Sequence, residues 1–259
     1  AQPAAVNVVL IAGSSGSVVV DTGSSPAQGR AIRASAEEIL PVPLVGAVVT
    51  HAHFDHFYGL AAFDDLPTYG HESLEAALQA DQVAAEAADL GFDPEELRAP
   101  NRPLALARMI DLGDRHVEIV HFGPGHTAGD VVVIVPDADV IVTGDLYEQS
   151  APPAMGADCH LKAWPVALDG ILGLVNERTL LVPGHGEPFD RVFAFTQRAE
   201  ISAVYGQVEY LIAQGVKLDD ALKTGEWQYD DDTIAAVLPI AYAQLAAEGK
   251  VPRPKLRLL

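Results

Sequence analysis

Residues 48–60, "VVTHAHFDHFYGL", place three histidines and an aspartate within six positions, directly after an apolar run. The chain has 259 residues and only nine histidines, so a third of its histidines lie in this stretch. Imidazole and carboxylate groups are ligands for first-row metal ions, which makes a metal site the first interpretation. The alternative is a polar turn that follows a strand.

Three later residues share the placement of this motif. His126 lies in "FGPGHTAGD", Asp145 ends "VIVTGD", and His185 lies in "LLVPGHG". Each follows an apolar strand candidate and lies in a turn that contains glycine, which lets a side chain be aimed into a cleft. Loops held by a rigid sheet are where sites are commonly built. The set as a whole therefore favours a metal site over unrelated surface residues.

The spacing inside the motif predicts two ligand positions. Residues two apart in an extended segment face the same side, so His51 and His53 can converge on one ion. Asp55 and His56, where the chain turns, would point towards a second position. Without metal, clustered carboxylates would repel each other and raise their pKa values, so the site makes electrostatic sense only when it is filled. The charges of five neutral histidines and two carboxylates favour two cations over one.

The charge of the chain bears on its partners. Its 36 acidic residues against 16 lysines and arginines give a net charge of −20. Such a field repels polyanions, which need basic surface to release counterions, so we expect no nucleic-acid or membrane partner. The alternative is that the acidic charge only makes the protein more soluble, which requires no partner. Oligomeric state is left open.

The chain lacks the marks of a membrane or disulfide-bonded protein. No stretch approaches 18 consecutive apolar residues, so no transmembrane helix is expected. "AQPAAVNVVL" has no basic segment before an apolar core, although an already removed signal peptide stays open. The single cysteine, Cys159, cannot form an internal disulfide and is compatible with a reducing compartment. We therefore favour a soluble, cytoplasmic protein.

Strand and helix signals alternate along the chain. Two strands in the first 23 residues read as a hairpin, and residues 72–90 read as one alanine-rich helix followed by a long surface excursion over 91–104. The pattern turns helical after Pro188. Strands with helices are expected before about residue 118 and again after it, which predicts two facing β-sheets with helices outside them. Further strands are expected at 44–50, 116–122, 130–136, 139–145 and 179–186, and further helices at 26–40, 165–175, 191–214, 217–223 and 231–248.

The motifs resemble those of the metallo-β-lactamase superfamily. "HAHFDH" is similar to the family's HxHxDH signature, "VVVDTG" is similar to its early aspartate motif, and the later histidine, aspartate and histidine follow in the family's order. The resemblance covers roughly residues 6–190. It implies an α/β (α+β) fold, a four-layer αββα sandwich over residues 1–190, with a C-terminal helical extension over 191–259 packed on the same domain.

The resemblance also assigns the ligands, in a glyoxalase II-like set. It implies two divalent metal ions, most readily Zn²⁺ with Fe or Mn as alternatives. Asp145 would bridge the two ions, and Asp21 would orient ligands, with a simple turn aspartate as the alternative. The first ion would be held by His51, His53 and His126, and the second by Asp55, His56 and His185.

Two such cations sharing a water make hydroxide available near neutral pH, so hydrolysis is the expected reaction and Asp55 the expected catalytic residue. Asp145 stands where zinc β-lactamases usually carry cysteine or serine, which makes efficient lactam hydrolysis less expected. The substrate would be a small ester, lactone, thioester or amide/lactam. A glutathione thioester would need basic groups, for which the C-terminal tail offers Lys250, Arg253, Lys255 and Arg257.

Several aromatic residues near the motifs are candidates for a substrate pocket, with core packing as the alternative. Phe57 and Met155 belong to the same candidate wall. Residues 72–110 could add to the pocket or form a lid. The four pocket candidates singled out are Phe54, Tyr58, Tyr147 and Trp164.

Two rival functions stay open. A persulfide dioxygenase of the same superfamily would use one iron ion held by two histidines and a carboxylate. A non-catalytic scaffold on this fold would bind no metal. Cys159 could approach the cleft but reads as an inert thiol. The remaining histidines read as structural or exposed, with His121 also a candidate to support a ligand: His71, His116, His121 and His160.

Overall fold

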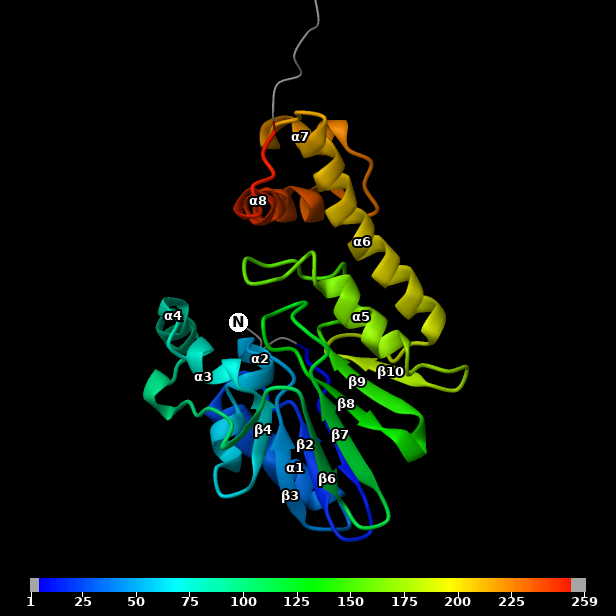
Figure 1. The fold of residues 1–259 in the computed structure, drawn as a ribbon. Coiled ribbons are helices and arrows are strands. Elements are labelled where there is room, and N and C mark those ends of the chain that lie inside the picture. The colour runs from blue at the N-terminus through cyan, green and yellow to red at the C-terminus, as the bar shows by residue number, and fades with distance from the viewer. Residues whose placement is uncertain (1–4, 253–259) are drawn as a thin grey trace, which may run out of the picture.

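Two five-stranded sheets form the centre of the computed structural model, which describes residues 5–252 (Figure 1). In the first sheet β1 and β2 form the expected antiparallel hairpin, and the remaining neighbours pair in parallel. The strands, in spatial order, are β1 (Val9–Ala12), β2 (Ser17–Val20), β3 (Leu44–Val48), β4 (Thr68–His71) and β5 (Arg102–Leu104).

The second sheet is antiparallel except at one edge, where β10 runs parallel to β9. The parallel pair brings the ends of β9 and β10 to the same edge of the sheet, so the turns that follow them are neighbours. The strands, in spatial order, are β10 (Leu180–Pro183), β9 (Val140–Gly144), β8 (Val132–Val135), β7 (His116–Val120) and β6 (Ala107–Asp111).

The strands alternate their side chains between two cores, as the period of two requires. Val18 and Val20 of β2 pack between the sheets with Val133 of β8, whereas Val19 packs outward against the helices on the first sheet. Val132 of β8 packs outward against the helices on the second sheet. The result is the expected four layers, helix–sheet–sheet–helix.

Helices cover the outer face of each sheet (Figure 1). Ser25 caps the helix that crosses the first sheet, accepting a hydrogen bond from the Gln28 amide, and Pro26 fits the first turn. The helices are α1 (Pro26–Ile39), α2 (Phe54–Phe57), α3 (Ser73–Ala77), α4 (Asp81–Leu90), α5 (Trp164–Leu172), α6 (Arg191–Ala213), α7 (Leu218–Thr224) and α8 (Asp231–Ala247).

The region between residues 68 and 104 differs from the expectation. The single helix over 72–90 is wrong, because the backbone becomes extended at Ala80 and separates α3 from α4. Leu74 of α3 and Val83 of α4 each reach the core, so packing overrides the uniform helical propensity of the alanines. The 91–104 segment is not wholly a surface excursion, because its last residues form β5 and bury Leu104.

The C-terminal helices share a core with the second sheet. Val204 of α6 and Leu245 of α8 belong to the same buried cluster as Ile134 and Ile141 of that sheet. The division into a sandwich over residues 1–190 and a C-terminal extension over 191–259 packed on the same domain stays a prediction. Among residues 5–252, no helix combines the length and apolar character that crossing a bilayer requires.

Candidate metal centre

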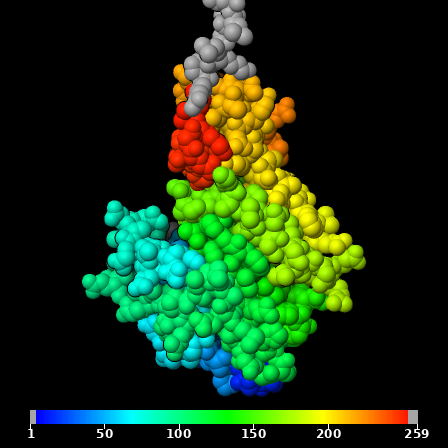
Figure 2. Space-filling view, viewed as in Figure 1, coloured from blue at the N-terminus to red at the C-terminus, as the bar shows by residue number. Residues whose placement is uncertain are grey.

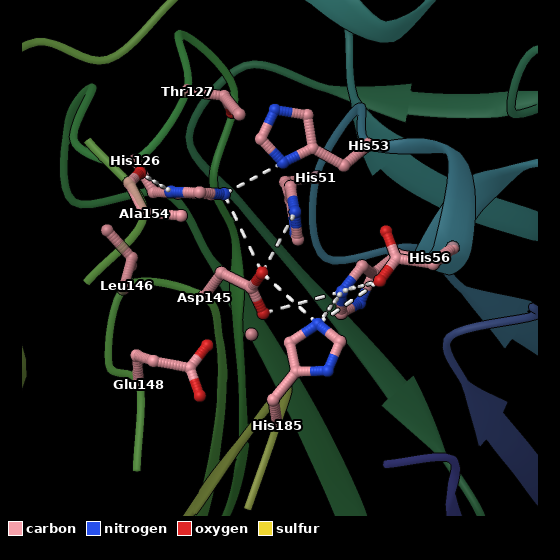
Figure 3. Close-up of polar contacts among 12 residues, drawn as sticks. His51, His53, His56, His126, Thr127, Asp145, Leu146, Glu148, Ala154 and His185 are labelled. Carbon is pink, nitrogen blue, oxygen red and sulfur yellow. Dashed lines mark hydrogen bonds and ion pairs between the residues drawn. The ribbon is translucent and has the colours of Figure 1, made fainter. Parts of the chain in front are cut away.

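The seven expected ligands gather at one edge of the sandwich, on the loops that follow β3, β7, β9 and β10 (Figure 3). His51 lies just after β3, and His53 is the capping residue directly before α2, with Asp55 and His56 in the single turn of that helix. This short helix was not expected from the sequence. It turns the last two side chains away from the first two.

The first ligand group consists of three histidines and a shared aspartate. His126 Nε2 lies 2.8 Å from His53 Nδ1. Asp145 Oδ2 lies 3.8 Å from His51 Nε2 and 3.7 Å from His126 Nε2. One ligand atom from each of these four residues lies within 4.8 Å of all the others, which is a spacing that one ion can span.

The second ligand group lies on the other side of Asp145. His185 Nε2 is 3.1 Å from Asp55 Oδ2 and 3.3 Å from His56 Nε2. Asp145 reaches this group as well, with its Oδ1 3.4 Å from His56 Nε2 and its Oδ2 3.5 Å from His185 Nε2. Asp145 therefore contacts both groups, as a bridging carboxylate must.

Unpaired buried atoms point to an ion at this place. Within residues 5–252, His51 Nε2 and Asp145 Oδ1 are among the few buried side-chain atoms with no hydrogen-bond partner. Leaving a buried polar atom unpaired costs about 1–3 kcal/mol, so such atoms call for an explanation. Both atoms face the ligand groups, and the set of imidazoles and carboxylates suits a divalent metal ion such as zinc.

Asp21 holds ligands of both groups in place. Its Oδ2 lies 2.8 Å from His56 Nδ1, and its Oδ1 accepts the Thr50 amide at 2.8 Å. Thr50 Oγ1 in turn lies 3.0 Å from His51 Nδ1. Asp21 is 1% exposed and has a φ of 64°, a conformation in which residues other than glycine are uncommon. Asp21 is thus buried against His56 and Thr50, and its role in orienting ligands stays a prediction.

Backbone carbonyls orient two further histidines. His126 Nδ1 lies 3.0 Å from the Ala154 oxygen, and His185 Nδ1 lies 3.0 Å from the Ala5 oxygen. Because a carbonyl only accepts, both rings carry a proton on Nδ1, and Nε2 is the nitrogen that faces the ligand groups.

Asp158 was not expected from the sequence. Its Oδ2 lies 2.9 Å from His53 Nε2, so it fixes that ring with Nδ1 facing His126. Asp158 is 105 positions from His53 and lies in a loop without a strand signal. No local pattern in the sequence indicated this contact.

Glu148 was also missed, three residues after Asp145. Its carboxylate lies near Asp145 and His185, is 6% exposed and accepts hydrogen bonds from the Ser150 amide and hydroxyl. Burial raises the pKa of Glu148. Gln197 of α6 pairs with both the amide and the carbonyl of Glu148, so a C-terminal helix holds this loop.

The electrostatics divide the histidines into two kinds. Burial lowers the pKa of His126 to about 4 and that of His51 well below its usual range, so both rings are neutral and ready to bind a metal. Hydrogen bonds to Asp145 and Asp55 raise the pKa of His185 to about 10. Burial opposes the charged form of His56, but Asp21 and Asp145 outweigh it and raise its pKa well above the usual value.

Asp130 organises the loop that carries His126. Its carboxylate accepts hydrogen bonds from the Gly125 amide and from the amide and hydroxyl of Thr127. His121 donates from Nδ1 to the Asp130 carbonyl and stacks on His71 at 4.2 Å between ring centroids. His121 thus reaches the ligand loop only through the backbone.

The aromatic pocket candidates lie mostly in the core. Tyr147 and Trp164 are fully buried, and Trp164 donates to the Leu146 carbonyl with its ring 5.5 Å from that of His126. Tyr58 is 2% exposed and donates to Glu86 of α4. Phe54 alone of the four is half-buried. Their role as pocket walls stays a prediction, and the geometry favours packing for the three buried rings.

Among the described residues, none of the remaining candidates belongs to either ligand group. Cys159 is buried, which raises the pKa of its thiol to about 12. His116 and His160 are exposed. Lys250 pairs with Glu209 and Glu248 instead of facing the site. The other basic tail residues, Arg253, Lys255 and Arg257, lie outside the described residues.

Two ligand groups that share an aspartate, on the loop edge of a two-sheet sandwich, define a metallo-hydrolase fold. The chain belongs to the metallo-beta-lactamase superfamily, whose family model matches residues 1–185. This match confirms the family resemblance and the sandwich expected from the sequence.

Named relatives include two kinds of hydrolase. The acyl-coenzyme A thioesterase MBLAC2 of Bos taurus is 31% identical over 219 residues, covering 72% of this chain and 76% of the relative. The metallo-beta-lactamase type 2 of Bacillus cereus is 25% identical over 187 residues, covering 71% and 68%. Among solved structures, the metallo-beta-lactamase from Pontibacter korlensis superposes with a TM-score of 0.61 at 23% identity, covering 76% of this chain and 86% of the other.

Proposed function

We propose that this chain hydrolyses a small thioester with two divalent metal ions, most readily Zn²⁺, bound by the two ligand groups. The observation that carries the proposal is the position of Asp145, whose oxygens face both groups at 3.4–3.8 Å. A single ion would leave one of the two groups without a function. The second group adds three candidate ligands of its own and so favours two ions over one, and metal content separates this proposal from a mononuclear iron oxygenase.

The thioester is favoured among carbonyl substrates by two features. The bridging position is a carboxylate, Asp145, as in the glyoxalase II-like set, and not the cysteine or serine that zinc β-lactamases usually carry. The thioesterase relative is also more similar in sequence than the β-lactamase relative, at 31% against 25% identity. A lactam is the second candidate because of that latter relative.

The protein's own groups prepare the reaction. Asp55 belongs to the second group, and interaction with His185 outweighs burial and lowers its pKa, so it is a carboxylate at neutral pH. We assign to Asp55 Oδ2 the orientation of the attacking water. Burial keeps the imidazole rings of His51 and His126 neutral.

Bound divalent cations would lower the pKa of the water and polarise the carbonyl. The water oxygen then forms a bond to the acyl carbon, the carbon–sulfur bond breaks, and the sulfur leaves with the electron pair. Of the two protons of the water, one passes to the thiolate and the other is released to solvent, so that a carboxylate and a thiol are the products. No oxidant or reductant takes part.

Metal content per chain, measured in protein purified without added metal, tests the proposal first. About two zinc equivalents, together with thiol release from an acyl thioester that stops after chelation, would support it. One iron per chain with oxygen uptake on a persulfide would overturn it in favour of the dioxygenase. Hydrolysis of a chromogenic cephalosporin without thioester hydrolysis would favour the lactam.

Variants at the shared and unshared ligands sharpen the test. Asp145→Asn weakens both groups and should reduce bound metal towards zero. His185→Asn weakens the second group alone and should leave about one equivalent. Equal metal loss in both variants would contradict the assignment of Asp145 as the bridge.

A further inference from the structure

A cleft of about 810 Å³ opens beside the first ligand group. Its walls come from α3, the turn at 127–129, the loop at 157–163 and α8. Figure 2 shows α8 (red) and the α3–α4 region (cyan) on either side of a recess. Seven of the sixteen lining residues are alanine and one is glycine, so short side chains keep the cleft open.

Residues next to the ligands line the cleft, although none of the seven ligands lines it. Asp158 lines the cleft and also holds His53 Nε2 at 2.9 Å. Ala52, between two ligands in the sequence, and Thr127, directly after His126, line the cleft as well. A substrate whose carbonyl lies at the ligand groups would pass the His53–Asp158 pair to reach this cleft.

The walls of the cleft are tied together. Gln244 of α8 donates from Nε2 to the Cys159 carbonyl at 2.6 Å and accepts the Leu161 amide at 3.2 Å. At the outer rim, Lys162 pairs with Glu248 at 2.9 Å. These contacts fasten the C-terminal extension to the loop that carries Asp158. The cleft is therefore formed before a ligand binds, which lowers the entropy cost of binding.

Gly129 sets the width of the opposite side. A Cβ at this position would lie 2.1 Å from Ser73 Oγ and 2.9 Å from His71 Nδ1, so any larger residue would have to displace these side chains. The start of α3 is thereby held against the ligand loop.

We propose that this cleft binds the unbranched acyl chain of the substrate. The proposal rests on the proposed function and names the part of the thioester that is recognised. Alanine side chains present apolar surface without bulk, which suits a slim alkyl chain. Among the described lining residues, Lys162 is the one lysine or arginine, and Glu248 already neutralises it, so the cleft offers no cationic set for a phosphate-bearing thiol group.

Chain-length dependence tests this assignment. The metal-loaded full chain is assayed with acetyl, hexanoyl and decanoyl thioesters of N-acetylcysteamine. A fully buried methylene contributes about fourfold to kcat/KM, so we expect a rise of at least about tenfold from acetyl to hexanoyl. Hydrolysis of the acetyl thioester with no rise along the series would overturn the acyl-chain assignment while leaving the proposed function intact.

Matched tryptophan variants locate the effect in the cleft. Ala247→Trp on α8 and Ala77→Trp on α3 fill it from opposite walls, whereas the exposed Ala246 of α8 does not line it. We expect each filling variant to lower the decanoyl-to-acetyl ratio of kcat/KM about tenfold and Ala246→Trp to leave the ratio unchanged. A ratio that is the same in all three variants would overturn the proposal.

A binding experiment separates this proposal from the proposed function. Metal-free protein is titrated with a dansyl-labelled undecanoic acid, with decanol as a competitor. Fluorescence enhancement that decanol reverses, and that Ala247→Trp weakens about tenfold, supports the cleft even if no thioester is hydrolysed. Binding that neither filling variant changes would overturn it, as would rates that depend on the thiol portion and not on the acyl chain.

Discussion

Asp21 Oδ2 lies 2.8 Å from His56 Nδ1 in a buried pair, where the aspartate is 1% and the histidine 0% exposed. A carboxylate only accepts, so the proton of the ring is on Nδ1 and Nε2 is left to face the second ligand group. The other oxygen of Asp21 accepts the Thr50 amide, and Thr50 contacts His51. One carboxylate therefore aligns a ligand of each group.

We expect Asp21→Asn to lower metal affinity about 10–100-fold. Asparagine adopts the left-handed backbone that φ of 64° requires, so the variant changes the charge without adding strain. If the asparagine oxygen still accepts the hydrogen bond from the Thr50 amide, the asparagine NH₂ group faces His56 Nδ1. That NH₂ group donates, so it favours the His56 tautomer with the proton on Nε2. Competition with a chromophoric zinc chelator measures the affinity.

Asp139→Asn is the matched control for this variant. Asp139 is the other described residue besides glycine with a positive φ, 54°, and it bonds Asn176 and Arg178 away from the ligands. We expect wild-type metal affinity for Asp139→Asn. Equal affinities for both variants and the wild type would refute the orienting role of Asp21.

Asp158→Ala should weaken the first ligand group selectively. Asp158 accepts a hydrogen bond from His53 Nε2 and is about half exposed, so water can partly replace it. We therefore expect metal affinity to fall about tenfold, the lower end of the 10–100-fold range for such contacts. Asp158→Asn keeps an accepting oxygen and should lose less. Metal titrations of the two variants compare the effects. An equal loss of metal affinity would show that Asp158 acts through its charge and not through its hydrogen bond to His53.

Metal binding should release protons, with an affinity that rises with pH. The pKa of His185 is raised to about 10 in the metal-free protein, so this ring is protonated at neutral pH and must lose its proton to bind an ion. Each proton released makes affinity about tenfold stronger per pH unit below that pKa. Calorimetry in two buffers of different ionisation enthalpy measures the release, and a pH-independent affinity would contradict it.

The raised pKa of His185 has the opposite effect on the stability of the metal-free protein, which falls as the pH rises. A histidine whose pKa is raised on folding adds stability that is fully present below its unfolded value near 6.5 and is lost as pH rises through about 10. We therefore expect the Tm of metal-free protein to fall across this window more than the Tm of metal-loaded protein. Thermal scans from pH 6 to pH 10 compare the two forms.

The sequence predicted which residues gather in the two groups because they lie in the turns that follow apolar strands, where spacing and glycine are local signals. His51, His126 and His185 belong to this kind. Contacts such as Asp158 with His53 join positions 105 apart, and a loop without periodicity gives no sign of them. The break between α3 and α4 was missed because alanine favours helix throughout, whereas the packing of Leu74 and Val83 decides where the helix ends.

Gln197→Leu should destabilise the protein and disturb the loop that carries Asp145. Gln197, 5% exposed on α6, accepts the Glu148 amide at 2.9 Å and donates to its carbonyl at 2.6 Å. Leucine leaves both buried backbone groups unpaired, at about 1–3 kcal/mol each, so we expect a clear fall in the free energy of unfolding and weaker metal binding. Gln207→Leu, half-buried on the same helix, is the control. Denaturant melts and metal titrations compare the two, and metal binding left intact in Gln197→Leu would show that α6 supports the fold without positioning the centre.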